Sequence, residues 1–280
     1  MNGGRLNKRT TTLSIEDFFY SVGLQLRYRW LWERSNKLDD TIEKVVKPVD
    51  GAKRLFAKLI RRFKYLDHAQ AQECIKAIAF HIKETWKCDQ NTTLIMPVCK
   101  KTNRHPDGSL KMVYDLRTAL GGWKNNMIIN YFDAKDPHVT AGNNVILCDD
   151  FIGSGSTMEK RIDWIKNNMS PNAKLYVVSF ACMQAAKESI LGKTGVYVFS
   201  PIWLDKGIKD ESGDSVMLSM EALLSPKYNK EDMEKCTLGY GKAGSLYFNE
   251  DYRIPNNVYP IFWWGSLADG RELNSLFLRP

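Results

Sequence analysis

Apolar residues recur at helical spacing along the first third of the chain, over residues 14–87. Ser14 with Asp17, and Asp67 with Gln70, are typical of helix starts, because side chains at this spacing cap the first backbone N–H groups of a helix. The second start leads into a helix of about twenty residues. One face of that helix carries Cys74, Ile75, Ile78, Ile82 and Trp86. The pattern therefore predicts a helical N-terminal region.

The period changes after residue 92, where short apolar runs alternate with helical segments. Candidate helices lie at 157–168 and at about 184–191. The candidate strands are 93–98, 111–114, 127–132, 145–148, 175–181 and 196–199. Strands that alternate with helices predict an α/β fold with a mainly parallel sheet.

The tail of the chain has a third pattern. Two short apolar runs, 245–248 and 259–264, flank the turn residues Pro255-Asn256-Asn257, which favours a hairpin or an added lobe. Adjacent aromatic residues in a strand face opposite sides, so we expect Trp263 and Trp264 to pack in a core. The alternative is that one of them, or Tyr240, stacks against a base.

These patterns predict two parts. Residues 1–90 form a helical, basic N-terminal region, and residues 91–280 form an α/β domain. From about residue 236 that domain ends in a small β-containing lobe.

The most informative stretch is 145–157, which reads Val-Ile-Leu-Cys-Asp-Asp-Phe-Ile-Gly-Ser-Gly-Ser-Thr. It predicts a buried strand, an acidic pair, a loop of small residues and then a helix. Ligands of parallel sheets bind beyond the carboxyl ends of the strands, where Asp149 and Asp150 would lie. Ionised carboxylates accept hydrogen bonds, as vicinal ribose hydroxyls require. The loop and the helix N-terminus favour a phosphate.

The plain alternative for Gly-Ser-Gly-Ser-Thr is a flexible turn. A Walker loop is disfavoured because the Gly-x-x-x-x-Gly-Lys-Ser/Thr pattern and its lysine are absent, and the Rossmann fingerprint Gly-x-Gly-x-x-Gly is also absent. The stretch closely resembles the thirteen-residue phosphoribosyl-pyrophosphate motif of type I phosphoribosyltransferases. It departs from that motif at Gly153 and Ser154, where threonines are commoner.

The whole chain from about residue 15 resembles a narrower group, the phosphoribosyltransferase-like proteins of bacterial conflict systems. The likeness lies in the helical N-terminal region, the Cys-Asp-Asp-Phe-Ile-Gly-Ser-Gly-Ser-Thr loop, and the Leu-Gly-Tyr-Gly, Ile-Pro-Asn-Asn and Pro-Ile-Phe-Trp-Trp segments of the tail. Members of that group occur beside anti-phage elements, including retrons. The resemblance therefore implies a toxin-like effector in antiviral defence, with a retron reverse transcriptase and its RNA–DNA product as expected partners.

The resemblance also implies site roles and a cofactor. Asp149 and Asp150 would be the catalytic pair and the ligands of Mg²⁺, the ion that in this family holds pyrophosphate and hydroxyl oxygens. The substrate would be phosphoribosyl pyrophosphate or a related nucleotide. The phosphate-binding residues would be Ile152, Gly153, Ser154, Gly155, Ser156 and Thr157.

The sequence contains no clear motif for the residues that would bind the pyrophosphate. The family places a loop there after the first core strand, here at 97–108, which carries Lys100, Lys101 and Arg104. Arg117 is a weaker candidate, and Trp203 lies where the family often covers the base. No nucleobase-recognition motif is present, so the acceptor stays open between a base in nucleic acid, a protein side chain and water.

Charge and cysteine content add two expectations. The net charge is +8, and lysine and arginine are dense in the first quarter, interleaved with aromatic residues. The pattern fits buried aromatic stripes with solvated basic faces; nucleic acid or an acidic protein partner are the alternatives. The six scattered cysteines fit reduced thiols of a cytoplasmic protein, with no structural zinc. No apolar run has the length of a membrane span, and residues 1–12 lack the apolar core of a signal peptide.

Three functions remain open. The first is a Mg²⁺-dependent enzyme that acts at the ribose C1 as a glycosyltransferase or in related glycosidic chemistry. The second is a non-catalytic sugar-phosphate sensor that binds nucleic acid or a protein partner. The third is a salvage enzyme, which the missing base motif disfavours.

Overall fold

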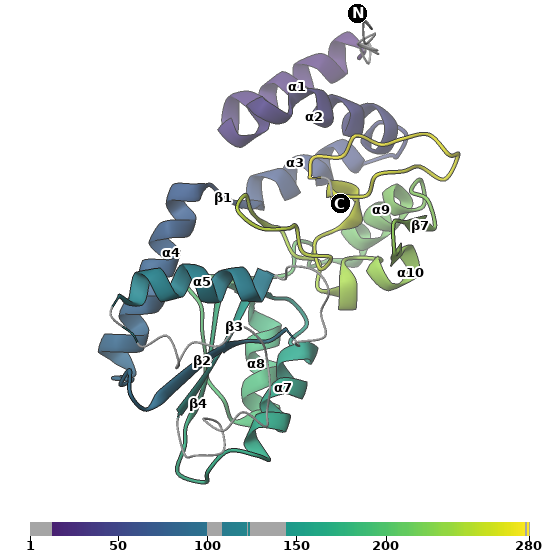
Figure 1. The fold of residues 1–280 in the computed structure, drawn as a ribbon. Coiled ribbons are helices and arrows are strands. Elements are labelled where there is room, and N and C mark those ends of the chain that lie inside the picture. The colour runs from purple at the N-terminus through teal and green to yellow at the C-terminus, as the bar shows by residue number, and fades with distance from the viewer. Residues whose placement is uncertain (1–12, 100–107, 122, 124–143, 278, 280) are drawn as a thin grey trace, which may run out of the picture. The chain divides into compact units, whose positions relative to one another are not determined.

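The chain divides into two compact units in the computed structural model, which describes residues 13–99, 108–121, 123, 144–277 and 279. The helical unit comprises Met1–Phe63, Ile208–Leu238 and Tyr259–Pro280. The sheet unit comprises Lys64–Gly207 and Gly239–Val258. Figure 1 shows the helices and strands of both units.

The sheet unit is built on a parallel sheet in the order β2-β3-β4-β5, with β6 also paired to β4. Its strands are β2 Thr93–Pro97, β3 Asn144–Ile152, β4 Leu175–Met183, β5 Val198–Phe199 and β6 Ile202–Leu204. Around the sheet lie α4 His68–Phe80, its π-helical continuation η3 His81–Thr85, α5 Gly108–Leu120, α7 Ser156–Lys166 and α8 Gln184–Thr194 (Figure 1). A separate parallel pair joins β1 Lys64–Leu66 to β9 Tyr247–Asn249.

Alternate side chains of β3 enter two separate cores. Val145 and Leu147 pack with residues of α7 and α8, whereas Ile146 and Cys148 pack with residues of α4 and α5. Side chains of a strand alternate between its two faces, so a strand covered on both faces reads as a continuous apolar run. The sheet is therefore the middle of three layers, and its carboxyl ends stay open for a site.

The predictions for the core elements are largely confirmed. The strands expected at 93–98, 145–148, 175–181 and 196–199 correspond to β2, β3, β4 and β5, and the two expected helices to α7 and α8. Both helix caps are present, since Ser14 accepts from the Asp17 N–H and Asp67 forms a capping box with Gln70. The α/β fold with a mainly parallel sheet is confirmed.

The strand expected at 111–114 is wrong, because this segment lies within α5. Met112, Val113, Leu116 and Leu120 are all buried, at the spacing of a helix. The short window around Val113 looked like a strand because it held too few residues to separate the two periods. The strand expected at 127–132 lies outside the described residues.

The helical unit gathers helices from both ends of the chain. They are α1 Ile15–Arg27, η1 Arg29–Arg34, α2 Ser35–Thr41, η2 Ile42–Val46, α3 Ala52–Arg62, α9 Glu211–Glu221, α10 Met233–Cys236 and η6 Pro260–Phe262, with a small hairpin of β7 Lys227–Tyr228 and β8 Glu231–Asp232. Aromatic rings from distant segments form its core. Phe63 lies 5.3 Å from Phe277 and 5.1 Å from Phe262, ring centre to ring centre. Trp263 and Trp264 are fully buried there, as expected.

The tail does not form the expected hairpin. Residues 247–249 form β9 beside β1, whereas Tyr259–Trp264 belong to the helical unit and include η6. The division of the chain also differs from the boundary expected at residue 90. Pairing of β1 with β9, and packing of Ile75, Ile78 and Ile82 against the sheet, bring residues 64–90 into the sheet unit.

The basic N-terminal segment follows the pattern of a solvated face. On α3, Leu55, Phe56 and Leu59 are buried, while Arg54 and Lys58 are exposed. On α3 the interleaving of aromatic and basic residues is therefore explained by amphipathic packing, whereas Trp32, in the preceding basic cluster, is 56% exposed. In the part of the chain that the structure describes, no helix is long and apolar enough to cross a membrane.

A buried carboxyl group, Glu221, gives the helical unit a pH-dependent stability. Its side chain is 3% exposed and accepts from the Leu238 N–H at 3.0 and 3.2 Å. Burial raises the pKa of Glu221 from 4.5 to about 8, although the Leu238 N–H opposes this shift. The folded state therefore binds this proton more tightly than the unfolded state does.

We expect the free energy of unfolding to fall between about pH 4.5 and pH 8. The limit for one such group is about 1.4 kcal/mol per pH unit. Glu221→Gln removes this dependence, whereas Glu33→Gln, at an exposed position, leaves it intact. Urea unfolding at several pH values, followed by tryptophan fluorescence, measures this; equal slopes in wild type and Glu221→Gln would contradict it.

Candidate functional site

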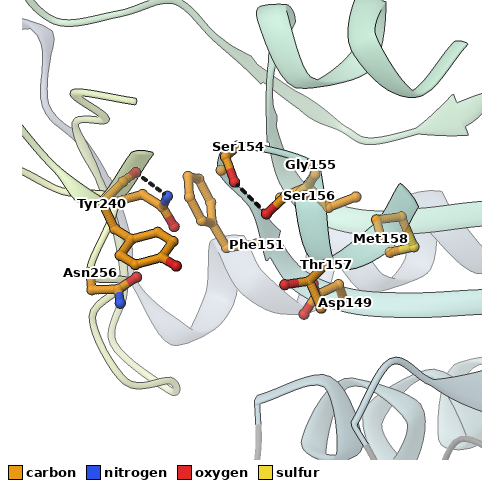
Figure 2. A pocket seen from close by; sticks show the side chains of 12 residues that line it. Asp149, Phe151, Ser154, Gly155, Ser156, Thr157, Met158, Tyr240 and Asn256 are labelled. Atoms are coloured by element: carbon orange, nitrogen blue, oxygen red, sulfur yellow. Dashed lines mark hydrogen bonds between the residues drawn. The ribbon is translucent and has the colours of Figure 1, made fainter. Parts of the chain in front are cut away.

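A cavity of about 340 Å³ lies at the carboxyl end of β3, within the sheet unit. Its lining joins the end of β3, the following loop and the first turn of α7 to a second segment from the tail. The lining residues are Asp149, Phe151, Ile152, Gly153, Ser154, Gly155, Ser156, Thr157, Met158, Tyr240, Asn256 and Asn257. Figure 2 shows Asp149 and Thr157 on one side of the cavity and Tyr240 and Asn256 on the other.

The loop leads directly into a helix whose N-terminus is free of side-chain caps. Gly155 is the residue before α7, with φ +79°, and no side chain caps the helix there. The hydroxyls of Ser154 and Ser156 lie 3.1 Å apart. N–H groups of a first helical turn have no partner within the helix, so this end can bind an anion. All six residues expected to bind phosphate line the same cavity.

The two aspartates point to opposite faces of the sheet. Asp149 lines the cavity, on the face of β3 that packs against α7 and α8. Asp150 lies beside the start of α5, where a Cβ on Gly108 would come within 2.4 Å of the Asp150 carboxylate. This split follows from the alternation of side chains along a strand. The pair expected to act together is therefore divided between the cavity and the α5 side of β3.

Two tyrosines surround the Asp150 side of the strand end. Burial raises the pKa of Tyr247 well above its ordinary value, and the Asp150 charge adds to this shift. Burial also raises the pKa of Tyr252, whose hydroxyl donates to Asp115 at 2.7 Å. Both hydroxyls are neutral at pH 7 at their ordinary pKa, and the raised pKa values move their ionisation further from neutral pH.

The tail segment supports the loop as well as lining the cavity. The Tyr247 ring stacks on Phe151, with ring centres 5.2 Å apart. The Tyr240 N–H donates to the Asn256 carbonyl at 2.8 Å, and Asn257 Nδ2 donates to the Tyr240 carbonyl at 2.8 Å. A Cβ on Gly153 would lie 2.2 Å from the Asn257 side chain, so loop and tail approach closely.

Tyr240 was considered for base stacking from the sequence, but its place beside the phosphate loop was not expected, nor were those of Asn256 and Asn257. The only signal in the sequence was the pair of glycines around Tyr240 in Leu-Gly-Tyr-Gly. Gly239 has φ +78° and ψ 142°, a conformation that few other residues adopt. Such a turn indicates a constrained backbone, but the sequence does not predict which residues the turn contacts.

The remaining predicted site residues lie elsewhere. Lys100, Lys101 and Arg104 fall outside the described residues. Arg117 is exposed on α5, and Trp203 is half-buried on β6 with Lys187 Nζ 4.7 Å from its ring centre. Neither Arg117 nor Trp203 lines the cavity.

The donor set of the cavity suits a hard cation only in company with a ligand. Among the described residues, no group of three or more His, Cys, Asp or Glu side chains is arranged so that it could hold a metal ion. Mg²⁺ is commonly held by one or two carboxylates together with the phosphates of a substrate. Asp149 fits that mode in the cavity, whereas Asp150 lies on the opposite face of β3, so the two carboxylates do not form a metal site of protein ligands alone.

Cysteine chemistry is not favoured at this site. Burial raises the pKa of Cys148, and burial together with the Asp149 charge raises the pKa of Cys182 to about 12. Both thiols therefore stay protonated and serve as packing residues.

A three-layer α/β unit with an acidic strand end, a small-residue loop and an uncapped helix N-terminus defines a phosphoribosyltransferase-like protein. The chain belongs to the PRTase-CE family, whose model matches residues 42–279. The resemblance to type I phosphoribosyltransferases, and the fold class expected from it, are confirmed by this match.

Similar solved structures share low identity with the chain. A hypothetical protein from Neisseria gonorrhoeae with bound ppGpp is 18% identical, with a TM-score of 0.36, and the match covers 57% of this chain and 97% of that one. Orotate phosphoribosyltransferase from Mycobacterium tuberculosis in complex with phosphoribosyl diphosphate is 13% identical, with a TM-score of 0.31 and coverage of 59% and 89%. These scores add no argument to the family match. No curated protein matches the chain.

The close approach of the tail to the loop is testable at Gly239. A Cβ there would lie 2.1 Å from the Asn257 carbonyl oxygen, a backbone atom. Gly195 also has a positive φ, +69°, but a Cβ there meets nothing within 4 Å. We expect Gly195→Ala to cost about 1 kcal/mol of stability for the backbone conformation alone. Gly239→Ala costs more, because the Asn257 backbone must also move. Urea unfolding of the two variants compares these costs, and equal costs would contradict the packing described.

Proposed function

We propose that the chain binds phosphoribosyl pyrophosphate or a related nucleotide with Mg²⁺ and acts at the ribose C1. The observation that carries this proposal is the shared cavity, in which Asp149 lies across from a small-residue loop at the uncapped N-terminus of α7. The Asp149 carboxylate can accept hydrogen bonds from the ribose hydroxyls, and the N–H groups at the start of α7 can donate to the 5-phosphate.

In this proposal the loop residues 152–157 hold the 5-phosphate through their backbone N–H groups, and the hydroxyls of Ser154, Ser156 and Thr157 add donors. Asp149 accepts hydrogen bonds from ribose hydroxyls. Mg²⁺ would be held by Asp149 together with the diphosphate of the ligand and would neutralise charge on the leaving group. Asp150, which the sequence predicts as a second ligand, lies on the other face of β3. Lys100, Lys101 and Arg104 are proposed to contact the same diphosphate.

Catalysis would then rest on placement of the reactants and on stabilisation of separated charge at C1. The acceptor is a base in nucleic acid, a protein side chain or water, so transfer and hydrolysis both fit the proposed site. The protein is thus proposed to be an enzyme of the glycosyltransferase type.

The biological role that we propose is that of a cytoplasmic effector in bacterial anti-phage defence. Its support is the likeness of the N-terminal region, loop and tail to phosphoribosyltransferase-like proteins of conflict systems. A retron reverse transcriptase with its RNA–DNA product is the proposed partner, and the basic N-terminal segment is the proposed contact for nucleic acid. The same likeness leads us to expect growth arrest on expression, lost when Asp149 is replaced.

The substrate class is tested by calorimetric titration of phosphoribosyl pyrophosphate with Mg²⁺. Asp149→Asn should weaken binding at least about tenfold, a loss of about 1.4 kcal/mol. Asp150→Asn should have a smaller effect, because its carboxylate lies on the other face of β3. Asp163→Asn, an exposed position on α7, is the matched control and should bind as wild type does.

Two outcomes decide the proposal. Unchanged binding by a folded Asp149→Asn variant would place the ligand elsewhere on the chain. Failure of the wild type to bind would favour the alternative, a non-catalytic sensor for another sugar phosphate that engages nucleic acid or a protein partner.

A further inference from the structure

The cavity continues past the phosphate loop to a wall that the proposed reaction does not use. Tyr240 and Asn256 form this wall, on the side away from Asp149 and Thr157 (Figure 2). The Tyr240 side chain is 41% exposed, although the residue lines the cavity. A large aromatic ring left open to a ligand cavity calls for a ligand group that covers it.

The backbone of this wall is held firmly. The Tyr240 N–H and carbonyl both bond to neighbours, the Asn256 carbonyl and Asn257 Nδ2. The flanking Gly241 contacts the loop, since a Cβ there would lie 3.1 Å from Ser154 Cβ. The ring is therefore carried on a fixed turn directly beside the phosphate loop.

The two asparagines play different parts. The Asn257 carboxamide is engaged with the turn through Tyr240. The Asn256 carboxamide makes no hydrogen bond with any other described residue, yet it lines the cavity. A carboxamide has two donors on nitrogen and an acceptor oxygen, so Asn256 presents both kinds of group to a ligand.

An aromatic face beside an open carboxamide is the pair of groups that recognises a nucleobase. Rings stack on the base, and carboxamides bond to its edge. With the ribose at Asp149 and its 5-phosphate in the loop, a group that reaches Tyr240 must be attached through that phosphate. A free 5-phosphate would leave the wall uncovered.

We infer that the site takes a ribose 5-phosphate whose phosphate is linked onward to a second nucleoside, with the base of that nucleoside stacked on Tyr240 and its edge toward the Asn256 carboxamide. This inference rests on the proposed placement of the 5-phosphate in the loop. It narrows the ligand to a dinucleotide-type molecule, in which C1 of the first ribose remains at the reactive end.

The test compares two probes, ribose 5-phosphate and ADP-ribose, by calorimetry on the full chain. ADP-ribose carries an adenosine that is linked to a ribose 5-phosphate through a diphosphate. We expect ADP-ribose to bind at least about tenfold more tightly, since stacking on one aromatic ring is of this order. Tyr240→Ala should abolish that preference without changing the affinity for ribose 5-phosphate, and Tyr240→Phe should retain it. Tyr197→Ala, 70% exposed on the same unit, is the control.

Equal affinity for the two probes, or a preference that survives in Tyr240→Ala, would overturn the inference while leaving the proposed function standing. Binding of neither probe by folded wild-type protein that still binds phosphoribosyl pyrophosphate would overturn the inference alone, and binding of none of the three ligands would overturn both.

A second and independent feature lies on α1 of the helical unit. The buried face of this helix carries Asp17, Ser21 and Leu24. On the opposite face Ile15, Phe19 and Leu26 are 79%, 67% and 74% exposed. The exposed Phe18 and the half-buried Val22 extend the same stripe at helical spacing. Contiguous apolar surface of this kind marks an interaction site.

The stripe is self-complementary when two copies run antiparallel. Ile15 would then meet Leu26 of the second copy, and Phe19 would meet its Val22. Glu16 and Arg27, which flank the stripe on one side, are both exposed, and Glu16 also pairs with Lys53 of its own chain at 2.8 Å. In the antiparallel pair each Glu16 would lie beside Arg27 of the second copy, so charges and apolar residues match together. The geometry points to a second copy of this chain as the occupant of the α1 face.

Sedimentation analysis of the full chain tests the pairing. We expect a dimer in the wild type, a monomer in Phe19→Asp, and a dimer in the control Phe80→Asp, a 65% exposed position on α4. Glu16→Arg should weaken the dimer, and Arg27→Glu in the same chain should restore it. A monomeric wild type, or a dimer that tolerates Phe19→Asp, would overturn this second inference.

Discussion

The site depends on the point at which β3 leaves the core of the sheet. Up to Cys148 its side chains are fully buried on both faces, which fixes the direction of the strand and the height at which it ends. The next two residues, Asp149 and Asp150, are only partly buried, and the alternation of the strand sends them to opposite sides before Phe151 and Ile152 are buried again. The chain then turns through Gly155 into α7, whose buried Met158, Ile162 and Ile165 hold the helix N-terminus toward the cavity. The same packed segment therefore positions both the carboxylates and the helix N-terminus that can bind an anion.

The tail completes what β3 begins. Tyr247 stacks on Phe151, and Asn257 lies against Gly153, so the loop is buttressed from a segment almost a hundred residues later. Beyond Val258 the chain enters the other unit, where Trp263 and Trp264 are buried. The tail, which the sequence predicts as one lobe, therefore contributes residues to two separate cores. This explains why the tail holds so many aromatic residues in so short a length.

Local features of the fold and the site could be read from the sequence, and non-local ones could not. Residues 145–157 are contiguous, so their strand, loop and helix could be predicted together with the phosphate-binding residues. Strands β2, β3 and β4 could be predicted because most of their residues are buried, whereas β6, whose three residues are half-buried, was not predicted. The segment at 111–114 was misread because three apolar neighbours fit either period. The roles of Asn256 and Asn257, and the pairing of β9 with β1, depend on contacts between distant segments that no local pattern encodes.

The most direct test of the proposed site is a crystal structure of the chain with ribose 5-phosphate. We predict that the phosphate accepts hydrogen bonds from backbone N–H groups within residues 153–157, with the ribose hydroxyls toward Asp149. A phosphate bound elsewhere, with this loop empty, would contradict the proposed site.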